Sequence, residues 1–203
     1  MKRYMNKIMW AMAMVMGLSS LTSCEDDAWG NDNPDYKNVF IVAFAEWGPK
    51  SNNDKTYTVA QGSQTEVPVQ LWCEGTRNFE AQAFVYADSQ LTLGTDYQVV
   101  DASGNVLQQN SNGAWVLTWD LRQPDTTNNH RVQNIAVKAL GGATGTVTLM
   151  TFDPKDVDAD GKLRISNGGT KDDDTEYYVP NNKTADYEVR CLTVNYKVNV
   201  TIQ

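Results

Sequence analysis

The sequence predicts an all-β protein whose strands are arranged as an antiparallel β-sandwich. Short segments in which apolar and polar residues alternate recur between residues 39 and 203, and this alternation is typical of strands with one buried face. Clusters of glycine, asparagine and serine separate these segments, as turns separate the strands of a sandwich. Outside the first 21 residues, no segment shows a sustained period of 3.6 residues. We therefore expect a single β-sandwich domain over residues 39–203.

The first 23 residues predict a secretory signal peptide that is cleaved from the mature protein. Lys2, Arg3 and Lys7 form a basic start without any acidic residue, and the apolar run Ile8–Leu21 follows them. A helix that spans a bilayer needs about 20 residues, so this run of 14 residues is too short for one. Its length and its basic flank are those of a secretory signal.

The end of the apolar run predicts lipidation. Leu21-Thr22-Ser23-Cys24 resembles the lipobox of bacterial lipoproteins, which implies that Cys24 is acylated and becomes the first residue of the mature protein. Glu25, Asp26 and Asp27 resemble the acidic export signal of Bacteroidetes lipoproteins, which implies an outer-membrane protein facing the cell exterior. An ordinary signal peptide and a solvated acidic tether are the alternative interpretations of these two features.

The mature chain is strongly acidic. The whole chain has a net charge of −8, and removal of the three basic residues of the signal lowers the net charge to −11. Such a chain repels nucleic acid backbones and anionic lipid headgroups. We therefore expect no nucleic acid partner, and membrane attachment through acyl chains such as palmitate. The polar segment 24–38, with Gly30 and Pro34, predicts a flexible tether.

The strands are expected wherever the alternating segments lie. The first segment, Val39–Ala45, is instead continuously apolar, which predicts a strand buried on both faces. The last, Glu188–Ile202, is the longest alternating run, and we expect it to form the terminal strand. The segments between them, in chain order, are Thr56–Ala60, Glu66–Cys73, Phe79–Ala87, Tyr97–Val100, Val106–Leu107, Trp115–Trp119, Val132–Leu140 and Thr146–Phe152.

Two β-hairpins are expected from their turn residues. Ser103-Gly104-Asn105 separates Tyr97–Val100 from Val106–Leu107, and Gly141-Gly142 separates Val132–Leu140 from Thr146–Phe152. Glycine and asparagine adopt the positive φ angles that tight hairpin turns require. Both pairs of segments are therefore predicted to lie side by side in one sheet.

Three of these segments carry a resemblance to a known family. Val67-Pro68-Val69-Gln70-Leu71, Gly94-Thr95-Asp96-Tyr97 and Ile135-Ala136-Val137-Lys138-Ala139-Leu140 occur in this order. The order is similar to that of Calx-beta-like domains, and it covers roughly residues 57–149. The resemblance implies an immunoglobulin-like β-sandwich, a module that recurs in Bacteroidetes surface lipoproteins.

The two remaining cysteines, Cys73 and Cys191, would lie in a compartment that permits disulfides. The alternation places Cys73 on the apolar face of its strand together with Val69 and Leu71, and places Cys191 on the polar face of the terminal run. Two buried thiols are therefore expected. A disulfide is the alternative if a β-bulge shifts the alternation.

We expect no enzymatic activity. His130 is the single histidine of the chain, and the sequence predicts that it is a surface residue in the loop 125–131. No nucleophile elbow, zinc-protease motif, phosphate-binding loop or Cys-x-x-Cys motif is present. A pair of catalytic carboxylates needs no sequence motif, so the glycosidase alternative stays open.

Three aspartates predict a calcium site. Asp156, Asp158 and Asp160 alternate ahead of Gly161, as in the first half of a calcium-binding loop of the EF-hand type. Carboxylate oxygens are the hard ligands that Ca²⁺ prefers, and the glycine permits a sharp turn. Asn167 stands where the bidentate glutamate of such loops would be. The alternatives are therefore a weak structural calcium site and a solvated acidic turn.

Two tryptophans are candidate ligand-binding residues. Trp72 alternates with Gln70 and Glu74 on the polar face of its segment, and Trp47 precedes Gly48-Pro49 at the end of a strand. An exposed indole ring beside polar groups suits stacking on a sugar ring. By contrast, the spacing of Trp115, Leu117 and Trp119 predicts core packing for these three residues.

The sequence therefore predicts a non-enzymatic surface lipoprotein, a binding or accessory module in glycan or nutrient uptake. A glycan or an outer-membrane transporter is the expected partner. The alternative is a fimbrial or adhesion subunit whose terminal strand pairs with a neighbouring subunit.

Overall fold

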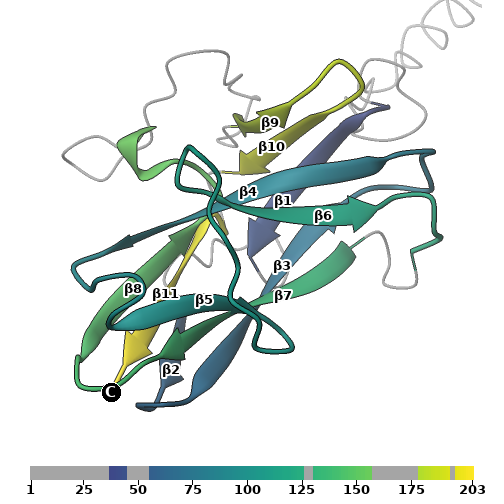
Figure 1. Ribbon diagram of the computed structural model, residues 1–203. Coiled ribbons are helices and arrows are strands. Elements are labelled where there is room, and N and C mark those ends of the chain that lie inside the picture. The colour runs from purple at the N-terminus through teal and green to yellow at the C-terminus, as the bar shows by residue number, and fades with distance from the viewer. Residues whose placement is uncertain (1–36, 45–54, 126–129, 157–177, 193–194) are drawn as a thin grey trace, which may run out of the picture. The chain divides into compact units, whose positions relative to one another are not determined.

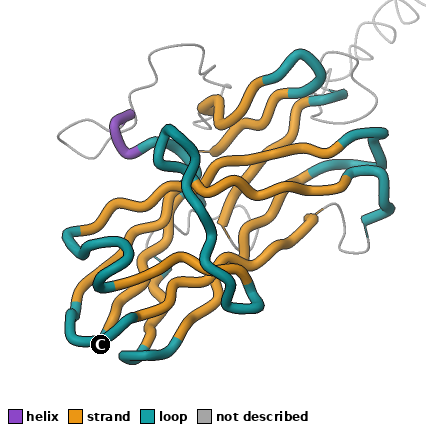
Figure 2. The backbone as a smooth tube through the Cα atoms, in the orientation of Figure 1, coloured by secondary structure: helices purple, strands orange, loops and turns teal. Residues whose placement is uncertain are grey.

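The computed structural model describes residues 37–44, 55–125, 130–156, 178–192 and 195–203. Residues Asn38–Gln203 form one compact unit. Within the described residues, eleven strands form two sheets, and the one helical element is a short 3₁₀ turn (Figures 1 and 2). The predicted all-β sandwich is therefore confirmed. No helix among the described residues is long and apolar enough to cross a membrane.

The two sheets contain six and five strands, whose order in space differs from their order in the chain. From one edge to the other, sheet A consists of β5 (Tyr97–Asp101), β7 (His130–Ala139), β3 (Gln64–Trp72), β1 (Val39–Phe44), β10 (Glu188–Leu192) and β9 (Tyr178–Lys183). Sheet B consists of β2 (Thr56–Val59), β11 (Lys197–Ile202), β8 (Gly145–Met150), β4 (Glu80–Ser89) and β6 (Trp115–Asp120). The 3₁₀ turn η1 (Pro154–Asp156) follows β8.

The core lies between the two sheets and is built from alternate residues of their strands. In β3 the inward residues are Val67, Val69 and Leu71, all fully buried, while the intervening residues lie on the outer face of sheet A. Strand β1 is the exception to one-sided burial, because Ile41 and Ala43 of its outer face are buried as well. This confirms the prediction that the first strand is buried on both faces.

The sheets are mixed, so the prediction of purely antiparallel sheets is wrong. Strand β1 pairs with β10 in parallel, and β2 pairs with β11 in parallel. In both cases a segment near the start of the domain lies beside a segment near its end. Pairing between segments so far apart in sequence leaves no turn signal between them, so local patterns do not reveal its direction.

The predicted terminal strand is in fact two strands in different sheets. Strand β10 pairs with β1 and β9 in sheet A, whereas β11 pairs with β2 and β8 in sheet B. Between them lies Asn195, with a φ of 57°, a left-handed conformation that asparagine tolerates better than most residues. The chain therefore changes sheets there, and the buried positions change from odd to even numbers.

The prediction of a hairpin at Gly141-Gly142 is also wrong. Strand β7 lies in sheet A and β8 lies in sheet B, and the two glycines have φ values of 115° and 89°. These conformations carry the chain from one sheet to the other. At Ser103-Gly104-Asn105 a tight turn does form around the Asp101 carboxylate, but the pairing beyond it is a single bridge between Val100 and Val106.

Side chains close the sandwich where the backbone pairing of β4 ends. Strand β8 pairs only with residues 86–89 of β4, and none of the described strands pairs with the same edge of β4 further towards its start. There Asn181 of β9 accepts a hydrogen bond from Phe84 N at 2.8 Å and donates one to Phe84 O at 2.8 Å. Asn182 donates to Gln82 O, and Gln82 N donates to the hydroxyl group of Tyr187. The hairpin of β9 and β10 beside β4 (Figure 1) thus acts as a side-chain substitute for a strand.

Cys73 and Cys191 are buried thiols that are not bridged to each other. Strand β1 lies between β3 and β10, and two strand spacings correspond to about 10 Å, beyond the reach of a disulfide. The default expectation for these cysteines is confirmed. Cys191 nevertheless faces the core, because the shift of alternation at Asn195 reverses the face that the sequence predicted.

Candidate functional site

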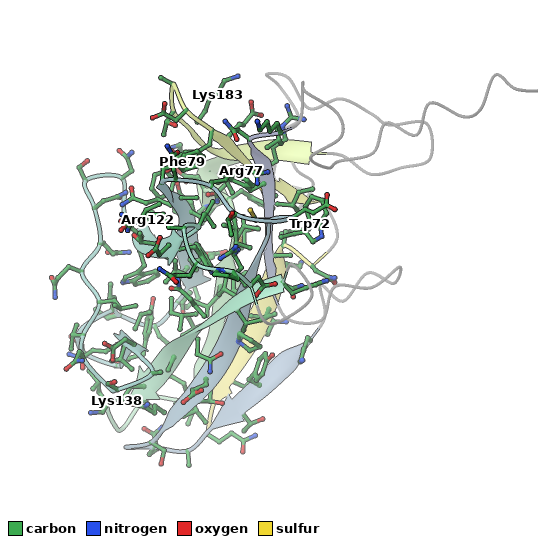
Figure 3. The ribbon with its side chains drawn as sticks, turned by 90° about the vertical axis from the view of Figure 1, so that its right-hand side faces the viewer. Trp72, Arg77, Phe79, Arg122, Lys138 and Lys183 are labelled. Atoms are coloured by element: carbon green, nitrogen blue, oxygen red, sulfur yellow. The ribbon has the colours of Figure 1, made fainter. Side chains whose placement is uncertain are left out.

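The candidate site lies on the outer face of sheet A around Trp72. The register aligns Trp72 of β3 with Ile41 of β1 on one side and with His130 of β7 on the other. Two residues earlier in β3, on the same face, Gln70 lies between Ala43 and Val132. We refer to these six residues as the Trp72 site. Figure 3 shows Trp72 on the opposite side of the molecule from Arg122, which follows β6 of sheet B.

Trp72 has the largest apolar side chain of this site. Its side chain is partly exposed, and the indole ring makes no hydrogen bond or ring contact within the described part of the chain. Ile41 and Ala43 beside it are buried, whereas Val132 is 49% exposed. This face is therefore shielded from solvent at Ile41 and Ala43 of β1 and exposed to solvent at Val132 of β7.

Gln70 supplies a buried polar group to the same face. Its exposed fraction is 4%, and its Oε1 atom lies 3.1 Å from Nδ1 of His130. A carboxamide oxygen only accepts, so the Nδ1 atom of His130 is the donor in this arrangement. The Nε2 atom of Gln70 is buried and has no hydrogen-bond partner among the described residues. A buried polar group in this state costs about 1–3 kcal/mol of folding stability.

The charged residues next to the site are paired with one another. Arg190 of β10 aligns with Ile41, and its Nε atom lies 2.5 Å from Oε1 of Glu188. Lys183 Nζ lies 3.1 Å from the other oxygen of Glu188. Partial burial opposes ionisation of Glu188, but the hydrogen bonds from Arg190 and Lys183 outweigh it and lower the pKa of this carboxyl group. The Trp72 site thus borders a cluster in which two cations share one carboxylate.

Most of the sequence-predicted site residues lie outside the described residues. This holds for Cys24, the three acidic residues 25–27, Trp47, Asp158 and Asp160. Asp156 ends the turn η1, but its side chain is not described. Lipidation, export and calcium binding therefore stay predictions. No cluster of three or more histidine, cysteine or acidic residues that could hold a metal occurs in the described part of the chain.

Trp72 is the predicted ligand residue that the structure describes, and it lies on the face that the alternation predicted. Gln70 shares that face, also as the alternation indicates. His130, expected in a surface loop, is instead the first residue of β7 and is partly buried. That prediction is wrong because the strand begins two residues earlier than its apolar pattern. The contact between His130 and Gln70 depends on strand register, which the local sequence does not contain.

The other described tryptophans belong to the core, as predicted. Trp115, Leu117 and Trp119 are buried on the inner face of β6. The indole nitrogen of Trp119 donates a hydrogen bond to Arg131 O at 2.7 Å, which joins β6 to β7 across the end of the sandwich. Burial of both ring and nitrogen leaves these residues no ligand role.

No family model matches the chain, and no curated protein matches it. What the Trp72 site can bind is therefore inferred from the arrangement of its residues. An aromatic plane, a buried carboxamide group and an imidazole group lie together on one sheet face. Small-molecule binding sites combine groups of these kinds, because an apolar surface provides contact area and a few polar groups fix the ligand's orientation.

Proposed function

We propose that the protein is a lipid-anchored, non-enzymatic binding protein of the cell surface that binds a glycan at the Trp72 site. The observation that carries the binding role is the partly exposed indole ring of Trp72 beside Gln70 and His130 on the outer face of sheet A. The ring suits stacking against the C–H groups of a sugar, while the polar neighbours suit its hydroxyl groups.

The proposed location follows from the lipobox-like Leu21-Thr22-Ser23-Cys24 and from the acidic residues after it. Acyl chains on Cys24 would hold the protein at the outer membrane. Surface exposure would place the Trp72 site in the medium, where it could deliver glycans to an outer-membrane transporter. An assembly role through the terminal strand would require β11 to leave its place, because β2 and β8 pair with its two edges.

The binding role is tested with the mature protein purified in detergent and a panel of polysaccharides in affinity gel electrophoresis. Retardation of the wild-type protein by a polysaccharide should disappear in Trp72→Ala. It should be partly kept in Trp72→Phe, because phenylalanine retains a smaller aromatic face. Trp119→Phe is the matched control, since Trp119 is buried in the core. Equal retardation of the wild-type protein and Trp72→Ala would contradict the proposed site.

The location is tested by two changes in cells. Cys24→Ala should release the protein from membranes. Replacement of Glu25, Asp26 and Asp27 by alanine should keep the protein in the membrane and remove its accessibility to protease on intact cells. Accessibility that persists in the triple variant would refute the export role of these acidic residues.

A further inference from the structure

The carboxamide group of Gln70 is half satisfied. One end bonds to His130 Nδ1 at 3.1 Å, while the other end is buried and meets no hydrogen-bond partner in the part of the chain that the structure describes. Tyr57 and Arg131 also carry buried atoms in this state, but both belong to positions that pack towards the core. Gln70 alone of these three lies on an outer sheet face, next to the partly exposed Trp72 and the exposed Val132.

A hydroxyl group is the chemical partner that suits this amide. Because this end is shielded from solvent in the ligand-free protein, binding has to turn the amide towards the surface beside Trp72. There it can be met by an atom that accepts or donates one hydrogen bond, and a hydroxyl group does both. The match is the same whichever way round the amide oxygen and nitrogen are placed, because His130 satisfies one end and a hydroxyl satisfies the other. A saccharide presents several hydroxyl groups around a ring that can stack on Trp72.

The charge of the protein selects among saccharides. The chain carries a net charge of −8, and its field opposes polyanionic ligands. At the border of the site, Glu188 is paired with both Arg190 and Lys183, which leaves a local charge of +1 that is small beside the −8 of the whole chain. A carboxylated or sulfated polysaccharide would therefore meet net repulsion, whereas an uncharged one would not.

We propose, building on the proposed function, that the Trp72 site binds a neutral saccharide and that one sugar hydroxyl group completes the hydrogen bonding of the Gln70 amide. In the ligand-free protein the unpaired amide lowers stability, and in the complex it contributes affinity. The two properties are therefore opposed at this residue. Gln70→Leu should remove the unpaired group and the ligand contact together, and the partly exposed His130 can bond to water in place of Gln70.

The experiment measures binding and thermal unfolding of the mature protein in detergent for the wild type, Gln70→Leu, Gln98→Leu and Trp72→Ala. The probes are the neutral polysaccharides galactomannan, xyloglucan and amylopectin, with polygalacturonate as the anionic probe. Gln98 is the matched control, because it lies on the outer face of sheet A at the far end from Trp72, opposite Lys138. Figure 3 shows Trp72 and Lys138 at these two ends.

We expect at least one neutral probe to bind the wild-type protein. Gln98→Leu should bind that probe with the affinity of the wild type. Gln70→Leu should weaken binding about tenfold, the value of one hydrogen bond, with an unchanged or higher melting temperature. A lower melting temperature with unchanged affinity would make Gln70 a structural residue and overturn this inference, while loss of binding in Trp72→Ala would still support the proposed function. Binding of polygalacturonate alone would overturn the neutral class. A wild type that binds no probe would overturn the inference and the proposed function together.

Discussion

Asn181→Ala should destabilise the protein strongly for a substitution at a polar residue of the hairpin of β9 and β10. The Asn181 side chain makes three hydrogen bonds, one from Phe84 N and one each to Phe84 O and Thr151 O. At about 1 kcal/mol each, their loss should lower the free energy of unfolding by about 3 kcal/mol. All three are partly buried, so water replaces them incompletely. For a domain of this size, 1 kcal/mol corresponds to about 2–4 °C, which gives a fall of roughly 6–12 °C in melting temperature.

Asn182→Ala is the matched control for this prediction. Asn182 is the next residue of β9. It donates to Gln82 O at 2.9 Å in an exposed position and, at the longer distance of 3.5 Å, to the Tyr187 hydroxyl group, so loss of its side chain should cost about 1 kcal/mol. Urea unfolding at equilibrium, followed by tryptophan fluorescence, measures both variants with the wild-type protein. If Asn181→Ala is no more destabilising than Asn182→Ala, the edge of β4 is not closed by Asn181 and the reasoning is refuted.

Two further predictions concern protons and calcium. The pKa of Glu188 is lowered from its ordinary value of 4.5 by Arg190 and Lys183, so the folded state favours the ionised carboxylate. Its contribution to stability is present above that value and is lost as the pH falls through the lowered pKa. Urea unfolding at pH 6 and at pH 3 should therefore show a smaller loss of stability in Glu188→Gln than in the wild type, and equal losses would contradict the ion-pair role. Millimolar calcium should raise the wild-type melting temperature relative to excess chelator, and Asp158→Ala should remove most of that difference. Identical melting in calcium and chelator would identify the aspartate triplet as a solvated turn.

The outer face of sheet A shows how far local patterns predict a binding site. The alternation of Gln70 and Trp72 on one face follows from the two-residue period of any strand, and it is visible in the sequence. The partner strand is not. His130 lies 58 residues after Trp72, and only the register between β3 and β7 brings the two side by side. An aromatic residue with one polar neighbour is therefore predictable, whereas the hydrogen bond between Gln70 and His130 is not.

The existence of most strands could also be predicted from local sequence, whereas their direction and the sheet to which they belong could not. Nine alternating segments and one continuously apolar segment predicted ten strands. Most of these exist near the expected bounds, because burial imposes its pattern on the residues of a strand. Strand β9 escaped prediction, since Tyr178–Lys183 carries Pro180, Asn181 and Asn182 rather than an apolar pattern. It pairs with β10 through the backbone, and its two asparagines bond to β4, a contact that exists only once the sandwich has formed.

Residues close together in the chain were enough to predict the all-β class and the core faces of the central strands, and the expected lipid anchor rests on such residues too. Long-range pairing instead determines that residues 188–202 form two strands in opposite sheets and that β1 and β2 have parallel neighbours. It also places strand β1 between Cys73 and Cys191. Each of these features depends on which distant segments become neighbours. Which segments pair is determined by burial of the whole core, and it cannot be predicted from any single segment.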